Sequence, residues 1–252
     1  MLRYVYDGSF LGFLTCVFES YRLRSDPEEI TAEKRLEQIL FAEDVAVQTD
    51  EEKADRVFQG LLKISPVVPH DVYYAYLTEI KGIERHILQF IRKTIKAKKS
   101  IAGNVSDEDI RLTMKAAQGA GGESHMFKGL LRFTELADGT LYGPFEPDYN
   151  VVPLLSSHFK HRLRGKIWLI HDTRRNCAAY FDGNDIAFYE NIEAPVQDAV
   201  QGKDSVVADN ENTVRELWRG YFHSIAIKER LNPALQRSIM PKKYWKYLTE
   251  KL

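Results

Sequence analysis

The stretch that decides the fold is KIWLIHDTRRNCAAYFDG, residues 166–183. Two short runs in it, Lys166–His171 and Cys177–Phe181, are rich in apolar side chains and flank the polar segment Asp172–Asn176. Short apolar runs bounded by polar turn residues are typical of strands that pair as neighbours. The stretch therefore predicts two strands, and the Asp-Gly turn after them predicts a third strand at Ile186–Tyr189.

A second hairpin is predicted upstream of this stretch. Ala137-Asp138-Gly139 is a strong turn signal between the strand-like runs Leu130–Leu136 and Thr140–Phe145. Val151–Leu163 between the hairpins has the composition of a helix. The pattern predicts an α+β fold with a central, mainly antiparallel sheet of two hairpins joined by a helix, flanked by N-terminal and C-terminal helices.

Helical periodicity dominates the chain before residue 120. Apolar side chains recur every three or four positions there, after a short strand-like run at the N-terminus. Gly119–Gly122 suggests a flexible joint where the composition changes. Predicted helices in this part cover Phe10–Arg22, Pro69–Lys81 and Ile83–Lys99.

We expect one compact unit over residues 1–252, because the length suits a single large domain. Its predicted parts are a mainly helical half at 1–120, a β-rich centre at 121–190, a polar connection at 191–212 and basic helices at 213–252.

The composition is that of a soluble protein, with 44% hydrophobic and 28% charged residues. Two cysteines are too few for a disulfide framework and indicate a reducing compartment. No apolar run approaches the roughly 20 residues that a membrane-crossing helix needs. We therefore expect a cytoplasmic protein without a membrane partner.

The formal net charge of −1 conceals a separation of charge along the chain. Asp26–Asp55 holds eleven acidic and three basic residues, whereas Arg215–Lys251 holds nine basic and three acidic ones. A further basic cluster occupies Lys160–Arg175. Such separation steers polyanions to the basic regions, although the alternative is a solvated surface with internal ion pairs.

The last predicted helix is amphipathic. At 100° per residue, one arc is apolar and another is cationic. We expect the aromatic residues Trp218, Tyr221 and Phe222 to pack in the core, with stacking on bases as the alternative, and the cationic arc to contact phosphates. The apolar arc holds Val214, Leu217, Trp218, Tyr221 and Ile225, and the predicted nucleic-acid contacts are Arg162, Arg164, Arg215, Arg219, His223, Arg230, Lys242 and Lys243.

Four residues are candidates for catalysis if the protein is an enzyme. His158 and His161 are spaced to lie one helical turn apart, and Glu135 and Asp172 lie near hairpin ends, where acid–base groups are often displayed. The alternative is that the histidines contact phosphate or backbone and that the acids serve turns and strands. No phosphate-binding loop or zinc-protease motif is present, and we assign no metal and no cofactor.

A set of short motifs spans most of the chain. They are YDGSFxGFLT at residues 6–15, RFxELxDG at 132–139, HFxxR at 158–162, WxIxDxR at 168–174, LWxxYF at 217–222 with the following Ile225, Ile227, Arg230, Asn232 and Pro233, and MPxxYW at 240–245. In these motifs the chain resembles a bacterial family of DNA metabolism or DNA repair proteins of unknown mechanism.

The resemblance implies a DNA-related role beside a radical-SAM protein assigned to DNA repair or modification. In some members the same domain is fused to a uracil-DNA-glycosylase-like domain, and we expect this chain to be the stand-alone form, which needs a partner in trans. No catalytic residues carry over. Three hypotheses remain open: a DNA-binding accessory protein, an enzyme acting on a damaged base or nucleotide, and a protein-interaction module.

Overall fold

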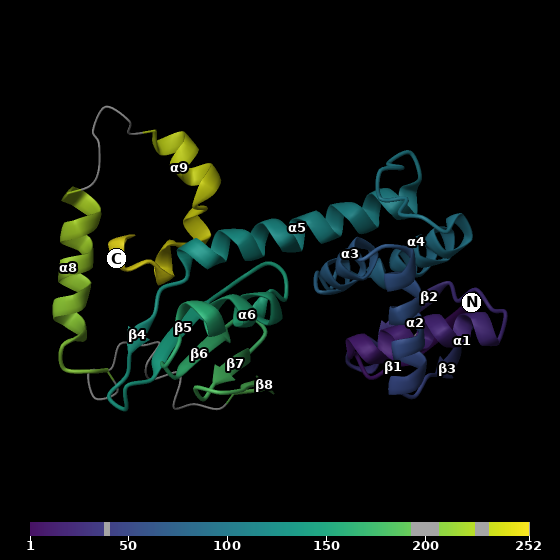
Figure 1. The fold of residues 1–252 in the computed structure, drawn as a ribbon, viewed down its shortest axis with the longest axis horizontal. Coiled ribbons are helices and arrows are strands. Elements are labelled where there is room, and N and C mark those ends of the chain that lie inside the picture. The colour runs from purple at the N-terminus through teal and green to yellow at the C-terminus, as the bar shows by residue number, and fades with distance from the viewer. Residues whose placement is uncertain (38–40, 193–206, 225–231, 252) are drawn as a thin grey trace. The chain divides into compact units, whose positions relative to one another are not determined.

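The chain divides into two compact units, Met1–Gly121 and Gly122–Leu252. Each has its own hydrophobic core, and we call them the N-terminal and C-terminal units. The boundary falls where the sequence changes composition near residue 120. The structure, a computed structural model (Figure 1), describes residues 1–37, 41–192, 207–224 and 232–251.

The N-terminal unit is built on a parallel sheet of three strands in the order β2-β1-β3. The strand-like run at the N-terminus is the central strand, but the sheet itself was not predicted from the sequence. β2 was not predicted because its four residues, EITA, lie within the acidic stretch. The strands are β1 (Leu2–Tyr6), β2 (Glu29–Ala32) and β3 (Glu43–Ala46).

Helices of the N-terminal unit pack on this sheet through apolar faces, and two of them begin at a capping side chain. The Ser9 side chain accepts a hydrogen bond from the Gly12 amide, and the Asp50 side chain accepts one from the Lys53 amide. Both are ordinary N-caps. The helices are α1 (Phe10–Arg22), η1 (Glu33–Arg35), α2 (Glu51–Ile64), α3 (Val67–Tyr76), α4 (Ile83–Ala97) and the start of α5 (Glu108–Leu130).

The turn between β1 and α1 is closely packed. The Asp7 carboxylate accepts hydrogen bonds from the Ser9 amide at 2.8 Å and from the Thr49 hydroxyl at 2.7 Å, which joins this turn to the segment after β3. Gly12 lies directly against this cluster, where an added Cβ would be 2.7 Å from Thr49 Oγ1 and 2.9 Å from the Tyr6 ring. The position therefore requires glycine.

The joint predicted at Gly119–Gly122 is wrong in its local structure, because these residues lie inside the continuous helix α5. Small residues here allow close packing rather than a bend. A Cβ on Gly121 would lie 3.3 Å from the ring of Tyr74, and Ala116 and Ala117 are buried in the N-terminal core.

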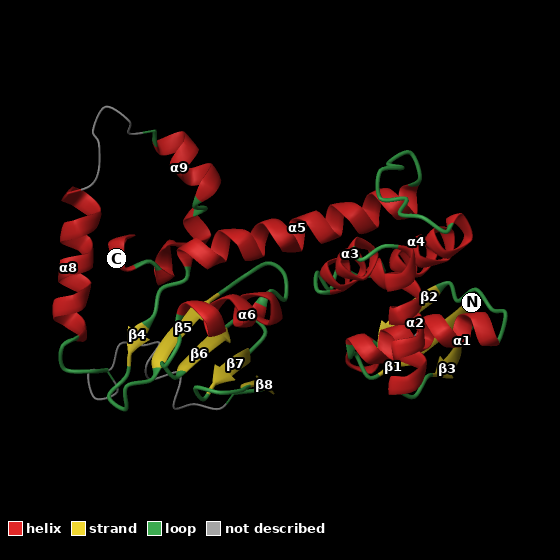
Figure 2. Cartoon of the chain, in the orientation of Figure 1, coloured by secondary structure: helices red, strands yellow, loops and turns green. Residues whose placement is uncertain are grey.

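The C-terminal unit contains a mixed sheet of five strands in the order β4-β5-β6-β7-β8 (Figure 2). The two hairpins and the joining helix are as predicted, and three of the four strand pairings are antiparallel, but the sheet is mixed because β5 and β6 pair in parallel. A helical crossover between two neighbouring strands makes them parallel. The strands are β4 (Thr134–Glu135), β5 (Leu141–Phe145), β6 (Trp168–Asp172), β7 (Cys177–Phe181) and β8 (Ile186–Glu190).

α6 (Val152–Arg162) packs on β6 and β7, and its buried Leu155 and Phe159 share a core with Trp168 and Ile170. None of the helices in the described ranges has both the length and the apolar composition needed to cross a lipid bilayer. The remaining elements are α8 (Glu211–Ser224), α9 (Pro233–Ile239), η4 (Lys242–Tyr247) and η5 (Thr249–Lys251).

We predict that Gly12→Ala lowers the free energy of unfolding by about 1–3 kcal/mol, because the new methyl group overpacks the β1–α1 turn. Gly60→Ala in α2 is the matched control, since nothing lies within 4 Å of its added Cβ. The control should stabilise the helix by up to about 1 kcal/mol. Urea unfolding followed by circular dichroism measures both, and equal effects would contradict the packing described for Gly12.

Candidate functional site

Cationic side chains gather at the end of α6 that leads into β6. His161 and Arg162 lie in the last turn of the helix, Arg164 and Lys166 lie in the loop that follows, and all four are exposed. The charge of Lys128, which is half-buried on α5, acts at the same place. We call this group the α6 basic patch: Lys128, His158, His161, Arg162, Arg164 and Lys166.

His158 reports the electrostatic character of the patch. Burial lowers the pKa of its imidazole below the usual value, and the charges of Lys128, Arg162 and His161 lower it further. Its Nε2 atom is buried and has no hydrogen-bond partner among the described residues. Burial is the larger cause and disfavours a charge of either sign, whereas the contribution of the neighbouring cations shows a positive field at this imidazole.

The helix dipole explains only part of this patch. Cations are favourable in the last turn of any helix, which accounts for His161 and Arg162. Arg164 and Lys166 lie beyond the helix, and Lys128 lies on another one. In the part of the chain that the structure describes, no ion pair joins Arg162, Arg164 or Lys166 to an acidic group. Their charges are therefore available to phosphates.

The predicted contacts on α8 are used inside the C-terminal unit. Arg215 Nε donates to Glu211 Oε1 at 3.0 Å, and its guanidinium also donates to the Thr134 hydroxyl. Arg219 Nε donates to the Thr249 carbonyl at 3.1 Å. These arginines hold α8 against β4 and η5, so part of their hydrogen-bonding capacity is already taken.

Two other predicted cations, Lys242 and Lys243, also have partners within this unit. Lys243 forms an ion pair with Asp148, and the Lys242 ammonium lies 5.8 Å from the centre of the Trp245 ring. Both side chains are exposed on η4. Arg230 lies outside the described residues, as does the side chain of His223.

A buried carboxylate near the C-terminus was not predicted from the sequence. The side chain of Glu250 is fully buried and accepts hydrogen bonds from Arg132 at 2.7 Å and from Trp218 Nε1 at 2.9 Å. Burial raises the pKa of Glu250, but the hydrogen bonds from Arg132 and Trp218 lower it more, so the group stays charged. Nothing in the local sequence marks this long-range pairing.

The prediction that Trp218, Tyr221 and Phe222 pack in the core is wrong, because none of the three is buried. Leu217 is 69% exposed, and Val214 and Tyr221 are also about half exposed. Trp218 and Arg219 lie on the side of α8 that contacts η5. Polar anchoring therefore leaves an apolar stripe on the surface; Ile225 lies outside the described residues.

Asp172 is a structural residue in this fold. Its buried carboxylate accepts the amides of Arg174 and Arg175 at 2.9 and 3.1 Å and pairs with the Arg175 guanidinium at 2.9 Å. The same guanidinium donates to the carbonyls of Pro147 and Asp148. Burial raises the pKa of Asp172, and Arg175 opposes that shift. The pair joins the β6–β7 turn to the segment after β5.

The four catalytic candidates do not converge. Glu135 pairs with Leu141 and Leu141 with Trp168, which places Glu135 at the amino end of the parallel strands. Asp172 lies at their carboxyl end. His158 and His161 are on the half of α6 that leads to the amino end of β6.

No group of three or more His, Cys, Asp or Glu side chains in the described ranges is arranged to hold a metal ion. His161 Nδ1 instead lies 2.7 Å from the Ser157 carbonyl, which belongs to its own helix. Lys128 was missed from the sequence, because only the fold brings α5 to α6.

We predict that Asp172→Ala and Arg175→Ala each lower the free energy of unfolding by about 3–5 kcal/mol, because each leaves a buried charge without its partner. The double variant should lose less than the sum of the two. All three tryptophans lie in this unit, so their fluorescence reports its unfolding in urea.

Asp182→Ala is the matched control. The Asp182 side chain accepts hydrogen bonds from two backbone amides, both at 2.8 Å. Asp172 also accepts two backbone amides, but Asp182 is exposed. Its loss should cost about 1 kcal/mol or less. Additive losses for Asp172 and Arg175, or a loss at Asp182 as large as at Asp172, would contradict the assigned role.

Comparison with known proteins places the chain in a family. No curated protein and no solved structure matches it significantly. The profile of the family described as domain of unknown function DUF4130 matches residues 81–250, which is more than half of the chain. The match includes the whole α6 basic patch. The chain is therefore a member of the DUF4130 family.

Proposed function

We propose that this protein is a DNA-binding accessory protein of DNA repair or modification, and that it holds the DNA backbone through the α6 basic patch. The observation that carries the proposal is the group of exposed cations Arg162, Arg164 and Lys166, none of which forms an ion pair with an acidic side chain among the described residues. Phosphate oxygens are the groups that such a surface recognises.

The main contacts to DNA phosphates then lie on α6 and in the loop after it, not on α8. Arg215 and Arg219 have partners within the C-terminal unit, whereas Arg162 and Arg164 extend into solvent. Lys242 and Lys243 are exposed, but Lys243 is paired with Asp148, which follows the carboxyl end of β5. The DNA context itself rests on the resemblance of the sequence motifs, which also suggests a radical-SAM protein or a uracil-DNA-glycosylase-like protein as the partner that supplies the chemistry.

A second candidate is a protein-interaction module, and the exposed stripe of Val214, Leu217 and Tyr221 favours it. Apolar anchors at this spacing are typical of helices that dock into a partner's groove. We expect Leu217→Asp to weaken capture of the neighbouring radical-SAM protein in a pull-down with nuclease present. Capture that disappears with nuclease alone would indicate bridging by DNA instead.

We predict that Arg162→Ala with Arg164→Ala weakens binding to duplex DNA and reduces the slope of log K against log salt by about 2. For each phosphate contact that is lost, binding releases about 0.9 fewer counterions, so the loss of two contacts changes the slope by about 2. Fluorescence anisotropy of a labelled duplex over a series of NaCl concentrations gives both affinity and slope.

Lys63→Ala with Arg237→Ala is the matched control, because it also removes two exposed cations. The slope of the control should stay within about 0.5 of the original protein's slope. Equal losses in the two double variants would mean that binding follows net charge alone, and an unchanged slope in the α6 variant would remove the patch from the proposal.

A further inference from the structure

A shallow pocket of about 540 Å³ lies in the N-terminal unit, between the last turns of α1 and α4. Its size falls within the range of small-molecule sites. It belongs to one unit only and is separate from the α6 basic patch. The residues that line it are Ser20, Tyr21, Arg24, Ser25, Asp26, Arg92, Ile95 and Lys96.

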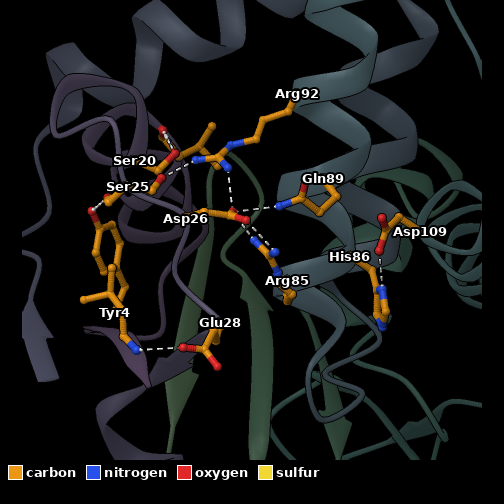
Figure 3. Close-up of polar contacts among 12 residues, drawn as sticks. Tyr4, Ser20, Ser25, Asp26, Glu28, Arg85, His86, Gln89, Arg92 and Asp109 are labelled. Carbon is orange, nitrogen blue, oxygen red and sulfur yellow. Dashed lines mark hydrogen bonds and ion pairs between the residues drawn. The ribbon is translucent and has the colours of Figure 1, made fainter. Parts of the chain in front are cut away.

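Asp26 fixes the cationic wall of this pocket. Its carboxylate accepts hydrogen bonds from Arg85 at 2.8 Å, from Gln89 at 2.9 Å and from Arg92 at 2.5 Å (Figure 3). Arg92 also donates to the Ser25 carbonyl at 2.5 Å. Three donors that reach from one face of α4 to a single carboxylate leave the Arg92 guanidinium little freedom to move.

The pocket keeps a positive surplus after this pairing. A guanidinium has five N–H donors, and two of those on Arg92 are bound to Asp26 and Ser25. Arg24 and Lys96 are exposed and add two further charges. Two helix C-termini face the region, but their partial charges, about −0.5 each, do not offset this surplus.

An apolar and aromatic surface lies beside the charges. The Tyr21 side chain is 44% exposed and Ile95 is 38% exposed, and the Arg92 guanidinium lies 5.6 Å from the centre of the Tyr21 ring. An exposed aromatic ring next to fixed cations is the combination that stacks on a nucleobase while its phosphate is held.

Arg24 adopts a backbone conformation that costs stability. Its φ is 50°, in the left-handed region, at the position after the cap of α1 where glycine is usual. The amides of Arg24 and Ser25 donate to the carbonyls of Tyr21 and Ser20, which completes the ordinary helix-ending motif. The turn therefore has a cation, Arg24, at a position where glycine would adopt the same φ without backbone strain, and this cation lines the pocket.

We propose that this pocket binds a nucleoside 5′-monophosphate group, with Tyr21 and Ile95 against the base and with Arg24, Arg92 and Lys96 on the phosphate. The group can come from a free nucleotide or from the 5′ end of a DNA strand. The site acts independently of the α6 basic patch and does not rest on the function proposed for it.

Isothermal titration calorimetry of the full chain with dAMP tests the proposal. Arg24→Gly should weaken dAMP binding about tenfold, through loss of a charge-assisted contact, without lowering the unfolding midpoint. Tyr21→Leu should weaken it about fivefold or more and leave the affinity for inorganic phosphate unchanged. A 5′-phosphorylated pentanucleotide that binds more tightly than dAMP would identify a strand end as the ligand, and the reverse order a free nucleotide.

Lys98→Gly is the matched control, because Lys98 is an exposed cation with φ of 52° after α4 that does not line the pocket. It should bind dAMP within about twofold of the original protein. Absence of dAMP binding, an equal loss in both glycine variants, or equal affinity for dAMP and inorganic phosphate would overturn the proposal. Arg162→Ala with Arg164→Ala should leave dAMP binding unchanged, which separates this result from the test of the patch.

Discussion

The parallel pairing of β5 with β6 is the constraint on which the C-terminal unit depends. Because both strands run in the same direction, the chain must return from the carboxyl end of one to the amino end of the other. α6 makes that return, so its cationic last turn and the loop to β6 lie at the amino edge of the sheet. The Asp172–Arg175 pair closes the opposite edge. The crossover thus separates the surface that is open to a ligand from the polar cluster that stabilises the fold.

Charged side chains have two different roles in this unit. Glu250, Asp172 and Glu123 are buried carboxylates that accept several hydrogen bonds each; Glu123 accepts the amides of Asp148 and Tyr149 and the Tyr244 hydroxyl, all at 2.8 Å. Breaking such a site by removing one partner typically costs several kcal/mol. Glu250 and Asp172 each bind one arginine, Arg132 and Arg175, and Glu123 joins Tyr244 to the segment after β5. Arg162, Arg164 and Lys166 of the α6 basic patch form no ion pair with an acid in the described chain, which leaves the patch electropositive although the protein carries a net charge of only −1.

Much of this architecture could be predicted from the sequence, because its signals are local. Asp138-Gly139 and the polar loop before Cys177 predicted both hairpins, and helical periodicity predicted Phe10–Arg22 as a helix. The parallel sheet of the N-terminal unit could not be predicted, since a short strand such as Glu29–Ala32 is defined by its partner strand. The same limit applies to the site. Periodicity could place Arg215 and Arg219 on one face of α8, but only the fold shows that this face meets Thr134 and Thr249.

The central claim is that DNA meets α6 rather than α8. Hydrogen–deuterium exchange of the full chain, with and without a 30-base-pair duplex at low salt, tests it most directly. Binding should slow exchange in peptides that cover residues 158–166 and leave those over residues 214–221 unchanged, because backbone amides that are covered by a ligand exchange more slowly. Slowed exchange confined to α8, or no change in either segment at saturating DNA, would contradict the account.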